Sequence, residues 1–442
     1  METIIKKTPC GDLKGVNYNG INRFLGIRYA IAERFELPEE VTKWDGIYEA
    51  LDYGPAPIQK STYFTADPAA PENHDTNEFM RGVKCEYSED CLYLNIWTPE
   101  NAVNAPVLIV IYGGGLVDGM SQSLESDGDE FARRGMITVT LNYRVNVFGF
   151  MYMKDLENES GKAGNYGYYD QHAAIEWVRH NIGSLGGNID NMTIIGQSAG
   201  AASAEGQIKS PLNKGYFKQA IIQSSAGFTT MLKAKDNREA EDRKWRAVYE
   251  ASGAKNIDEL KRMPAEDLFR AFQEISAKKP LAFCNTIYGE DFVSPKKNEP
   301  VDTKIMYSVT SEDVMPIVLH IMGKGLAKSQ SKLTDTYAYY FCRHLPGDNR
   351  GAWHSSDLMY VYSTLNRSWR PFTQDDYKLS ERMVSYLESF IKTGDPNHDS
   401  AEKWIPFNKS KKYMYFDTKK HGMKKIPLFH LIKVTLFPER IS

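Results

Sequence analysis

The sequence has few cysteines, and they show none of the spacings of a metal site or a disulfide framework. The five cysteines are Cys10, Cys85, Cys91, Cys284 and Cys342. This odd number, without a CxxC pair or a paired histidine spacing, predicts neither a zinc site nor a disulfide-stapled fold. We expect reduced thiols, with a Cys85–Cys91 bridge as the less favoured alternative. No metal and no cofactor is expected.

Long apolar runs and an excess of charge of one sign are also missing. The densest apolar stretch, residues 106–112, is far shorter than the ~20 residues that a bilayer-spanning helix needs. The amino end has no apolar segment typical of a secretory leader, which predicts a cytoplasmic protein without a membrane span. The formal net charge is only -3, so nucleic acid is not an expected partner. The oligomeric state stays open between a monomer and a small homo-oligomer.

No repeat, low-complexity tract or Ser/Gly-rich linker divides the chain, and we therefore expect a single domain over residues 1–442. Short apolar runs between glycines and prolines predict short antiparallel strands in the first hundred residues. From residue 105 onward, continuous β-branched runs predict strands that are covered on both faces. The expected strands are 106–112, 137–143, 192–196, 220–223, 304–310 and 336–343.

Helical periodicity appears between and after these strands. Ala173, Ala174, Trp177 and Val178 fall at helical spacing between two of the expected strands. Charged amphipathic patterns over 236–277 predict a helical excursion beside the sheet, which we place within residues 230–300. A further helix is expected from 380 to 392.

The segment Gly196-Gln-Ser198-Ala-Gly200 follows an apolar strand and has the pattern G-x-S-x-G. This pattern predicts a nucleophile elbow, in which a serine sits on a sharp turn between a strand and a helix. Glycines are needed two residues before and after, because side chains there would collide with the neighbouring strand and helix. The alternative interpretation is an ordinary N-cap serine in a glycine-rich turn.

A glycine run, Gly113–Gly115, follows the expected strand 106–111. Together with the N–H group of Ala199, such a run predicts an oxyanion hole made by Gly114, Gly115 and Ala199. The alternatives are a phosphate-cradling loop and a plain flexible loop. No Lys-Ser/Thr follows the glycines and no G-x-G-x-x-G is present, which disfavours nucleotide binding.

With these two elements in place, the chain resembles the type-B carboxylesterase family, the cholinesterase-like branch of the α/β-hydrolase fold. The resemblance implies an α/β fold with a large, mostly parallel central sheet flanked by helices and a helical excursion near the active-site cleft. It extends over almost the whole chain. The segments that carry it are 24–30, 88–97, 142–150, 164–171, 181–200 and 394–397.

The resemblance also implies the other members of a catalytic triad with Ser198. His354 stands in Gly351-Ala-Trp-His354, which is similar to the catalytic histidine loop of the family. Asp313 aligns with the family's acid, and the adjacent Glu312 is the alternative. His344 is expected to be a surface residue at the end of a strand.

Several charged residues of the family pattern are expected to be structural. The resemblance implies two ion pairs, Arg34 with Glu89 and Arg144 with Asp170, and removal of a buried partner should harm folding more than chemistry. Ser224 matches a serine that supports the triad acid.

Departures from the family pattern bear on the substrate. Gln197 replaces the glutamate that usually precedes the nucleophile, and 45–96 contains no tryptophan that would receive a quaternary ammonium group. A choline ester is therefore disfavoured. The segment 281–304 is expected to be shorter than in the family.

These observations predict a serine carboxylesterase that hydrolyses neutral small-molecule esters through an acyl-enzyme, with a small-molecule ester as its only expected partner. Two alternatives stay open. One is a non-catalytic cholinesterase-like binding or adhesion protein, and the other is the same mechanism acting on aromatic esters of the feruloyl type, amides or lactones.

Overall fold

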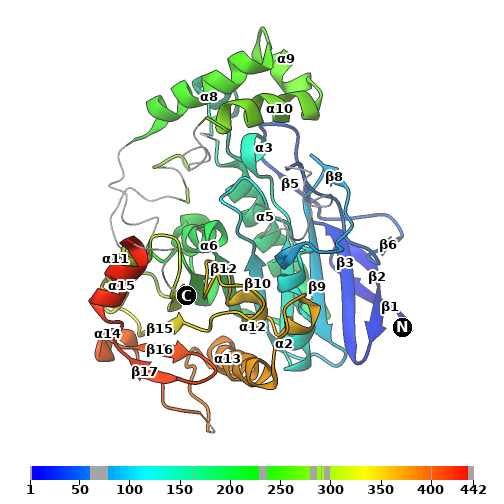
Figure 1. Ribbon diagram of the computed structural model, residues 1–442. Helices are drawn as coiled ribbons and strands as arrows, with labels where there is room; N and C mark the ends of the chain where they lie inside the picture. Colours follow the sequence, from blue (N-terminus) through cyan, green and yellow to red (C-terminus); the bar gives the residue numbers. More distant parts are fainter. Residues whose placement is uncertain are drawn as a thin grey trace.

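The computed structural model describes residues 2–59, 78–162, 164–227, 236–278, 286–289, 291–292, 299–399 and 401–436. Cys284 and half of the segment 281–304 lie outside the described residues. The described chain is built on one large mixed sheet (Figure 1). Its thirteen strands are β1 (Glu2–Thr8), β2 (Gly11–Tyr18), β3 (Ile21–Arg28), β6 (Ile47–Glu49), β9 (Tyr93–Pro99), β10 (Ala105–Ile111), β11 (Ile137–Leu141), β12 (Gly187–Gln197), β13 (Phe217–Gln223), β14 (Lys304–Thr310), β15 (Thr336–Phe341), β16 (Tyr413–Phe416) and β17 (Gly422–Lys424).

The sheet has an antiparallel edge and a parallel centre. Its strand order is β1-β2-β3-β9-β11-β10-β12-β13-β14-β15-β16-β17, with β6 paired to β2. All neighbours from β11 to β16 in this order are parallel, whereas β1, β2, β3 and β9 pair antiparallel. Two small ladders join β4 (Ala30–Ile31) to β5 (Glu39–Glu40) and β7 (Ala56–Pro57) to β8 (Tyr87–Ser88). The expected large, mostly parallel sheet is confirmed.

The sheet is accompanied by helices, and some of these cover both faces of its parallel centre. The helices are α2 (Asp129–Arg133), α3 (Asn146–Phe150), α4 (Lys154–Ser160), α5 (Tyr166–Asn181), α6 (Ala199–Lys209), α8 (Arg238–Ser252), α9 (Ile257–Arg262), α10 (Ala265–Ser276), α11 (Pro316–Gln330), α12 (Leu358–Val361), α13 (Gln374–Thr393), α14 (Phe407–Ser410) and α15 (Leu428–Leu436). Ile109 of β10 belongs to the core with α5, α6 and α11, and its neighbour Leu108 belongs to the core with α12 and α13. Alternate side chains of a strand point to opposite faces, so both faces of the sheet are buried.

The expected elements are found, and some of them are longer than predicted. β14 has the predicted bounds, whereas β12 begins at Gly187 rather than at Met192. Helix α13 begins at Gln374, several residues before the predicted start, because Thr373 forms a capping box with Asp376.

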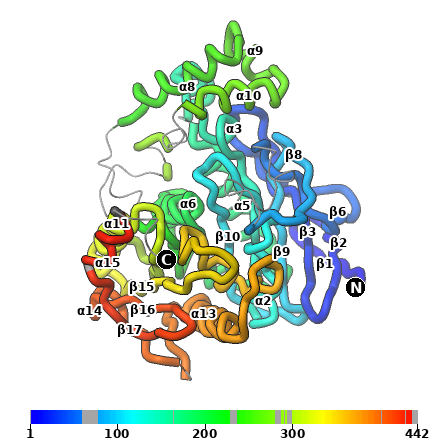
Figure 2. The backbone as a smooth tube through the Cα atoms, viewed as in Figure 1, coloured from blue at the N-terminus to red at the C-terminus, as the bar shows by residue number. Residues whose placement is uncertain are grey.

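The described part of the predicted helical excursion contains α8, α9 and α10. These helices gather at one end of the molecule, away from β16 and β17 (Figures 1 and 2). Trp245 of α8 stacks on Phe272 of α10, with ring centroids 6.1 Å apart. Arg34 donates to the carbonyl oxygens of Leu260 and Met263, which ties the excursion to the amino-terminal region. That residues 1–442 form a single domain stays a prediction.

Four cysteines lie in the described residues, and all four are free thiols. The less favoured Cys85–Cys91 bridge is therefore absent, and burial raises the pKa of both thiols. None of the helices in the described ranges has the length and apolarity that crossing a membrane would require.

Candidate active site

Ser198 sits on the turn between β12 and α6. Its backbone has a φ of 57° and a ψ of -126°, a combination that a residue with a side chain rarely adopts. Gly200 lies so close to β10, the strand beside β12, that an added Cβ would come within 2.2 Å of the Ile111 carbonyl oxygen. The glycine is therefore required for the turn to pack against β10, and the predicted elbow geometry is present.

The glycine run lies beside this turn, in the loop after β10. Gly114 has a φ of +112°, and its added Cβ would come within 2.1 Å of the Asp118 carbonyl oxygen. Gly114 and Gly115 line the same cavity as Ser198. Ala199 is the first residue of α6, where backbone N–H groups have no partner within the helix. The structure thus brings the three predicted oxyanion residues to one end of the parallel strands.

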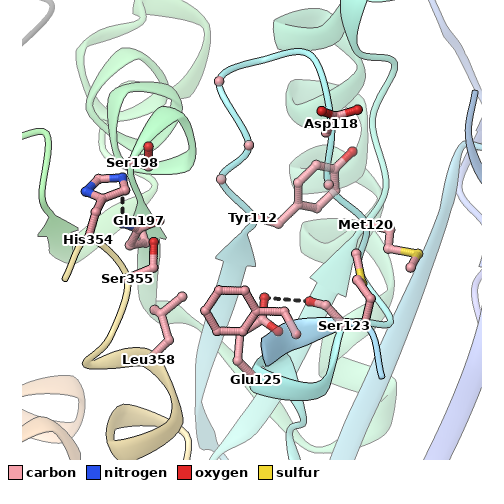
Figure 3. A pocket seen from close by; sticks show the side chains of 16 residues that line it. Tyr112, Asp118, Met120, Ser123, Glu125, Gln197, Ser198, His354, Ser355 and Leu358 are labelled. Atoms are coloured by element: carbon pink, nitrogen blue, oxygen red, sulfur yellow. Dashed lines mark hydrogen bonds between the residues drawn. The ribbon is translucent and has the colours of Figure 1, made fainter. Parts of the chain in front are cut away.

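Asp313 and His354 come from two further loops at the same edge of the sheet. Asp313 follows β14, and His354 follows β15 by way of a loop. The Nδ1 atom of His354 lies 2.5 Å from Oδ1 of Asp313. His354 and Ser198 line the same cavity, and Figure 3 shows both side chains at one end of it. Residues that are far apart in the sequence are therefore gathered in one place.

Asp313 is held by donors on both of its oxygens. Oδ1 accepts from the Val314 N–H group at 2.8 Å as well as from His354. Oδ2 accepts from the Ser224 hydroxyl at 2.6 Å and from the Thr310 N–H group at 3.0 Å. The support that the resemblance implied for Ser224 is confirmed as a contact. A carboxylate fixed in this way can orient the imidazole of His354.

Glu312, the alternative acid, contacts the histidine loop instead of the histidine ring. Its Oε2 accepts from the Ala352 N–H group at 2.6 Å, and its own N–H group donates to the Ala352 carbonyl at 3.1 Å. Its Oε1 lies 3.4 Å from Nε2 of His344, whose side chain is half exposed at the end of β15. Burial opposes ionisation of Glu312, but bonds from His344, Ser311 and Ala352 outweigh it and lower the pKa of Glu312. Asp313, and not Glu312, is thus the carboxylate that contacts the ring of His354.

Gln197 contacts the nitrogen of His354 that faces away from Asp313. The side-chain nitrogen of Gln197 lies 3.1 Å from Nε2 of His354 (Figure 3). An amide donor at Nε2 and a carboxylate acceptor at Nδ1 fit a neutral imidazole that carries its proton on Nδ1. That tautomer leaves Nε2 as the basic atom of the site.

These groups open into one cavity of about 360 Å³. Its apolar wall is formed by Phe79, Met80, Met120 and Leu358, and its polar wall includes Asp118, Ser123 and Glu125. No lysine or arginine of the described ranges lines it. Within the same ranges, no group of three or more His, Cys, Asp or Glu residues could hold a metal ion. The cavity can accept a small organic molecule beside Ser198.

Sequence reasoning missed three contacts of this site. They are the hydrogen bond between Gln197 and His354, the hydrogen bond that Glu312 accepts from the Ala352 N–H group of the histidine loop, and the place of Glu125 in the cavity wall. The proximity of Gln197 and Glu312 to predicted site residues was a usable signal for the first two. Glu125 carries no motif, and only the folded chain brings it into the cavity that Ser198 lines.

The two predicted structural ion pairs are present. Arg144 and Asp170 are almost fully buried and bond through two nitrogens to both carboxylate oxygens. Arg34 and Glu89 form a similar fork that is partly exposed. Neither pair lines the cavity, in agreement with a structural role.

The family model of the carboxylesterase family matches residues 2–332 and 306–430 of the chain. A para-nitrobenzyl esterase of Bacillus subtilis is 33% identical, in an alignment that covers 91% of this chain and 92% of that protein. A bile salt-activated lipase of Mus musculus is 27% identical over 90% of this chain and 81% of its own length.

Solved structures agree with these sequence matches. A PNB esterase structure superimposes with a TM-score of 0.83 at 23% identity, covering 98% of this chain and 99% of that one, which shows the fold. A carboxylesterase of Geobacillus stearothermophilus has a TM-score of 0.79 at 26% identity, covering 97% of this chain and 99% of that one. The α/β-hydrolase architecture predicted from the sequence is confirmed. The chain belongs to the carboxylesterase family and is a carboxylesterase.

Proposed function

We propose that the protein hydrolyses neutral small-molecule esters by nucleophilic catalysis at Ser198, through an acyl-enzyme. The observation that carries this proposal is the contact of 2.5 Å between Asp313 and His354, beside a serine on a strained turn. His354 with its proton on Nδ1 has a basic Nε2, as a general base requires, and it lines the same cavity as Ser198.

The reaction follows from the positions of these groups. The Ser198 hydroxyl oxygen attacks the ester carbonyl carbon, and its proton passes to Nε2 of His354. The N–H groups of Gly114, Gly115 and Ala199 stabilise the negative charge on the carbonyl oxygen of the tetrahedral intermediate. The proton then passes from His354 to the leaving alkoxide, and the alcohol departs.

Deacylation repeats the same steps with water. His354 takes a proton from a water molecule whose oxygen attacks the acyl carbon, and it returns that proton to Ser198 as the carboxylic acid leaves. Asp313 holds the imidazole and stabilises its charged form throughout, and it keeps its own charge.

The test is the Ser198→Ala variant with p-nitrophenyl acetate as substrate. Removal of the nucleophile is expected to lower kcat by about 10⁴-fold or more, and a fluorophosphonate probe should label the wild type but not the variant. Ser385→Ala, a change at a partly exposed serine of α13, is the matched control. A Ser198→Ala protein that hydrolyses the ester at the parental rate would overturn the proposal.

A further inference from the structure

Glu125 is a carboxyl in the wall of the catalytic cavity, and the reaction described above does not use it. It lies in a short 3-10 helix, Leu124–Ser126. Figure 3 places it at the opposite end of the cavity from Ser198 and His354. A substrate that fills the cavity therefore reaches from the nucleophile toward this carboxyl.

The bonding of Glu125 is incomplete. Its Oε1 accepts from the Ser123 hydroxyl at 2.7 Å, and the Ser123 hydroxyl is in turn 2.7 Å from that of Ser126. Its Oε2 is buried and has no hydrogen-bond partner among the residues that the structure describes. Buried polar atoms are nearly always bonded, so an exception in a substrate cavity calls for a partner from outside the protein.

The surroundings of Glu125 are acidic, and this favours a ligand that donates hydrogen bonds. Burial raises the pKa of Glu125 to about 7. The acidic neighbour Glu78 adds to this rise, and it is itself bonded to the buried Arg370. Asp118 lines the cavity as a second carboxyl. A carboxyl without a cation beside it is stabilised by a hydrogen-bond donor, and most strongly by a charged one.

We propose that Glu125 selects esters that carry a hydroxyl or protonated amino group at the end remote from the scissile bond. This inference rests on the proposed function and narrows its substrate class. The apolar residues Phe79, Met80, Met120 and Leu358 contact the aliphatic part of such a substrate, and Glu125 accepts the hydrogen bond from its tip. Above pH 7, where Glu125 is ionised, esters with a terminal carboxylate are rejected, because they bring a like charge to Glu125 and Asp118.

The test compares esters that differ only at the tip. Acetates of ω-hydroxyalkanols and of protonated ω-aminoalkanols with two to six carbons are compared with n-alkyl acetates of equal length. Methyl esters of ω-hydroxy acids, beside methyl alkanoates, place the donor on the acyl side. At one chain length, kcat/KM for a donor-bearing ester should exceed that of its alkyl counterpart at least about tenfold, since an unpaired buried acceptor rejects the analogue that lacks the donor.

Two substitutions separate charge from hydrogen bonding. Glu125→Gln keeps a side-chain acceptor but removes the charge, so it should lose the preference for the amino ester more than that for the hydroxy ester. Glu125→Leu should abolish both preferences. Glu266→Gln, at an exposed carboxyl of α10, is the matched control and should keep the wild-type ratios. Equal kcat/KM for donor and alkyl esters in the wild type at every length would overturn the inference.

Occupancy of the site during turnover gives a second measure of the preference. Each ester is tested for its ability to slow labelling of Ser198 by a fluorophosphonate probe. Donor-bearing esters should protect at lower concentration than alkyl esters, and equal protection at every length would overturn the selectivity of Glu125. Failure of the probe to label Ser198 would instead contradict the proposed function itself, so the two failures are distinguishable.

Discussion

Asp313 bonds to His354 beside the catalytic cavity, whereas Glu125 lines the wall of that cavity, and the oxygens of these two carboxyls are bonded very differently. Asp313 accepts four hydrogen bonds, including the one from His354. Glu125 accepts one from Ser123, and its second oxygen has no partner in the described part of the chain. A carboxyl whose two oxygens both accept hydrogen bonds from the protein is held in one orientation, and it can therefore position another group. A carboxyl with an unfilled acceptor is available to a ligand.

The largest expected effect comes from substitution of Asp313, the carboxyl whose oxygens are both bonded within the protein. Asp313→Asn should lower kcat by about 10⁴-fold, because the amide no longer holds the imidazole in the required tautomer. Glu312→Gln keeps an acceptor for the Ala352 N–H group, and its loss of kcat should be much smaller. Both are measured with p-nitrophenyl acetate at saturating concentration. A larger loss of kcat in Glu312→Gln than in Asp313→Asn would move the acid role to Glu312.

Asp170 is a third carboxyl for this comparison. Arg144 donates hydrogen bonds to both of its oxygens, and this carboxyl lies outside the cavity. Asp170→Asn leaves the buried Arg144 without its counter-charge and should lower the free energy of unfolding by about 3–5 kcal/mol. The kcat per folded molecule should stay near that of the wild type. Denaturant unfolding and active-site titration measure the two quantities.

The control for this change is Asp267→Asn, which breaks an exposed pair with Arg270. Such pairs contribute at most about 1 kcal/mol. Equal destabilisation by the two substitutions would contradict the structural role assigned to the buried pair.

The smallest expected effect concerns the pH dependence of stability at Glu125. Burial raises the pKa of Glu125 from 4.5 to about 7, so the folded chain holds a proton that the unfolded chain releases between these values. The free energy of unfolding therefore falls as pH rises through this window. Since one pKa unit corresponds to about 1.4 kcal/mol, the loss is at most about 3 kcal/mol.

Glu125→Gln has no such proton, so its stability relative to the wild type should rise between pH 5 and pH 8. Urea unfolding of both proteins across this range measures the difference. Glu266→Gln provides the control for removal of a carboxyl in general. A difference that is independent of pH would mean that Glu125 is not held in an environment that disfavours its charge.

Much of the fold could be predicted because buried strands have a distinctive sequence. Apolar β-branched runs gave β10, β13 and β14 to within a few residues. The start of β12 was missed because Gly187–Asn191 is polar and partly exposed, which looks like a loop in the sequence. That segment is a strand because Gly187 pairs with Ala105 of β10, and such a pairing cannot be seen in local composition.

Some residues of the site could be predicted from the sequence, and others could not. Ser198 and the glycine run follow from local patterns that need particular backbone conformations. His354 and Asp313 came from the family resemblance, because nothing local distinguishes Asp313 from Glu312. The role of Glu125 depends on which atoms surround it after folding, and the sequence carries no pattern for that.

The parallel order of β10 to β15 has a consequence for how the protein is made. The loops that carry Gly114, Ser198, Asp313 and His354 follow β10, β12, β14 and β15, which are separated by long stretches of chain. Contacts between residues so distant in sequence form late, because chain entropy must be lost before they are gained. During synthesis, a nascent chain that lacks β15 has a glycine loop and a serine turn but no base to activate the serine. Esterase activity should therefore appear abruptly, as one of the last events of folding.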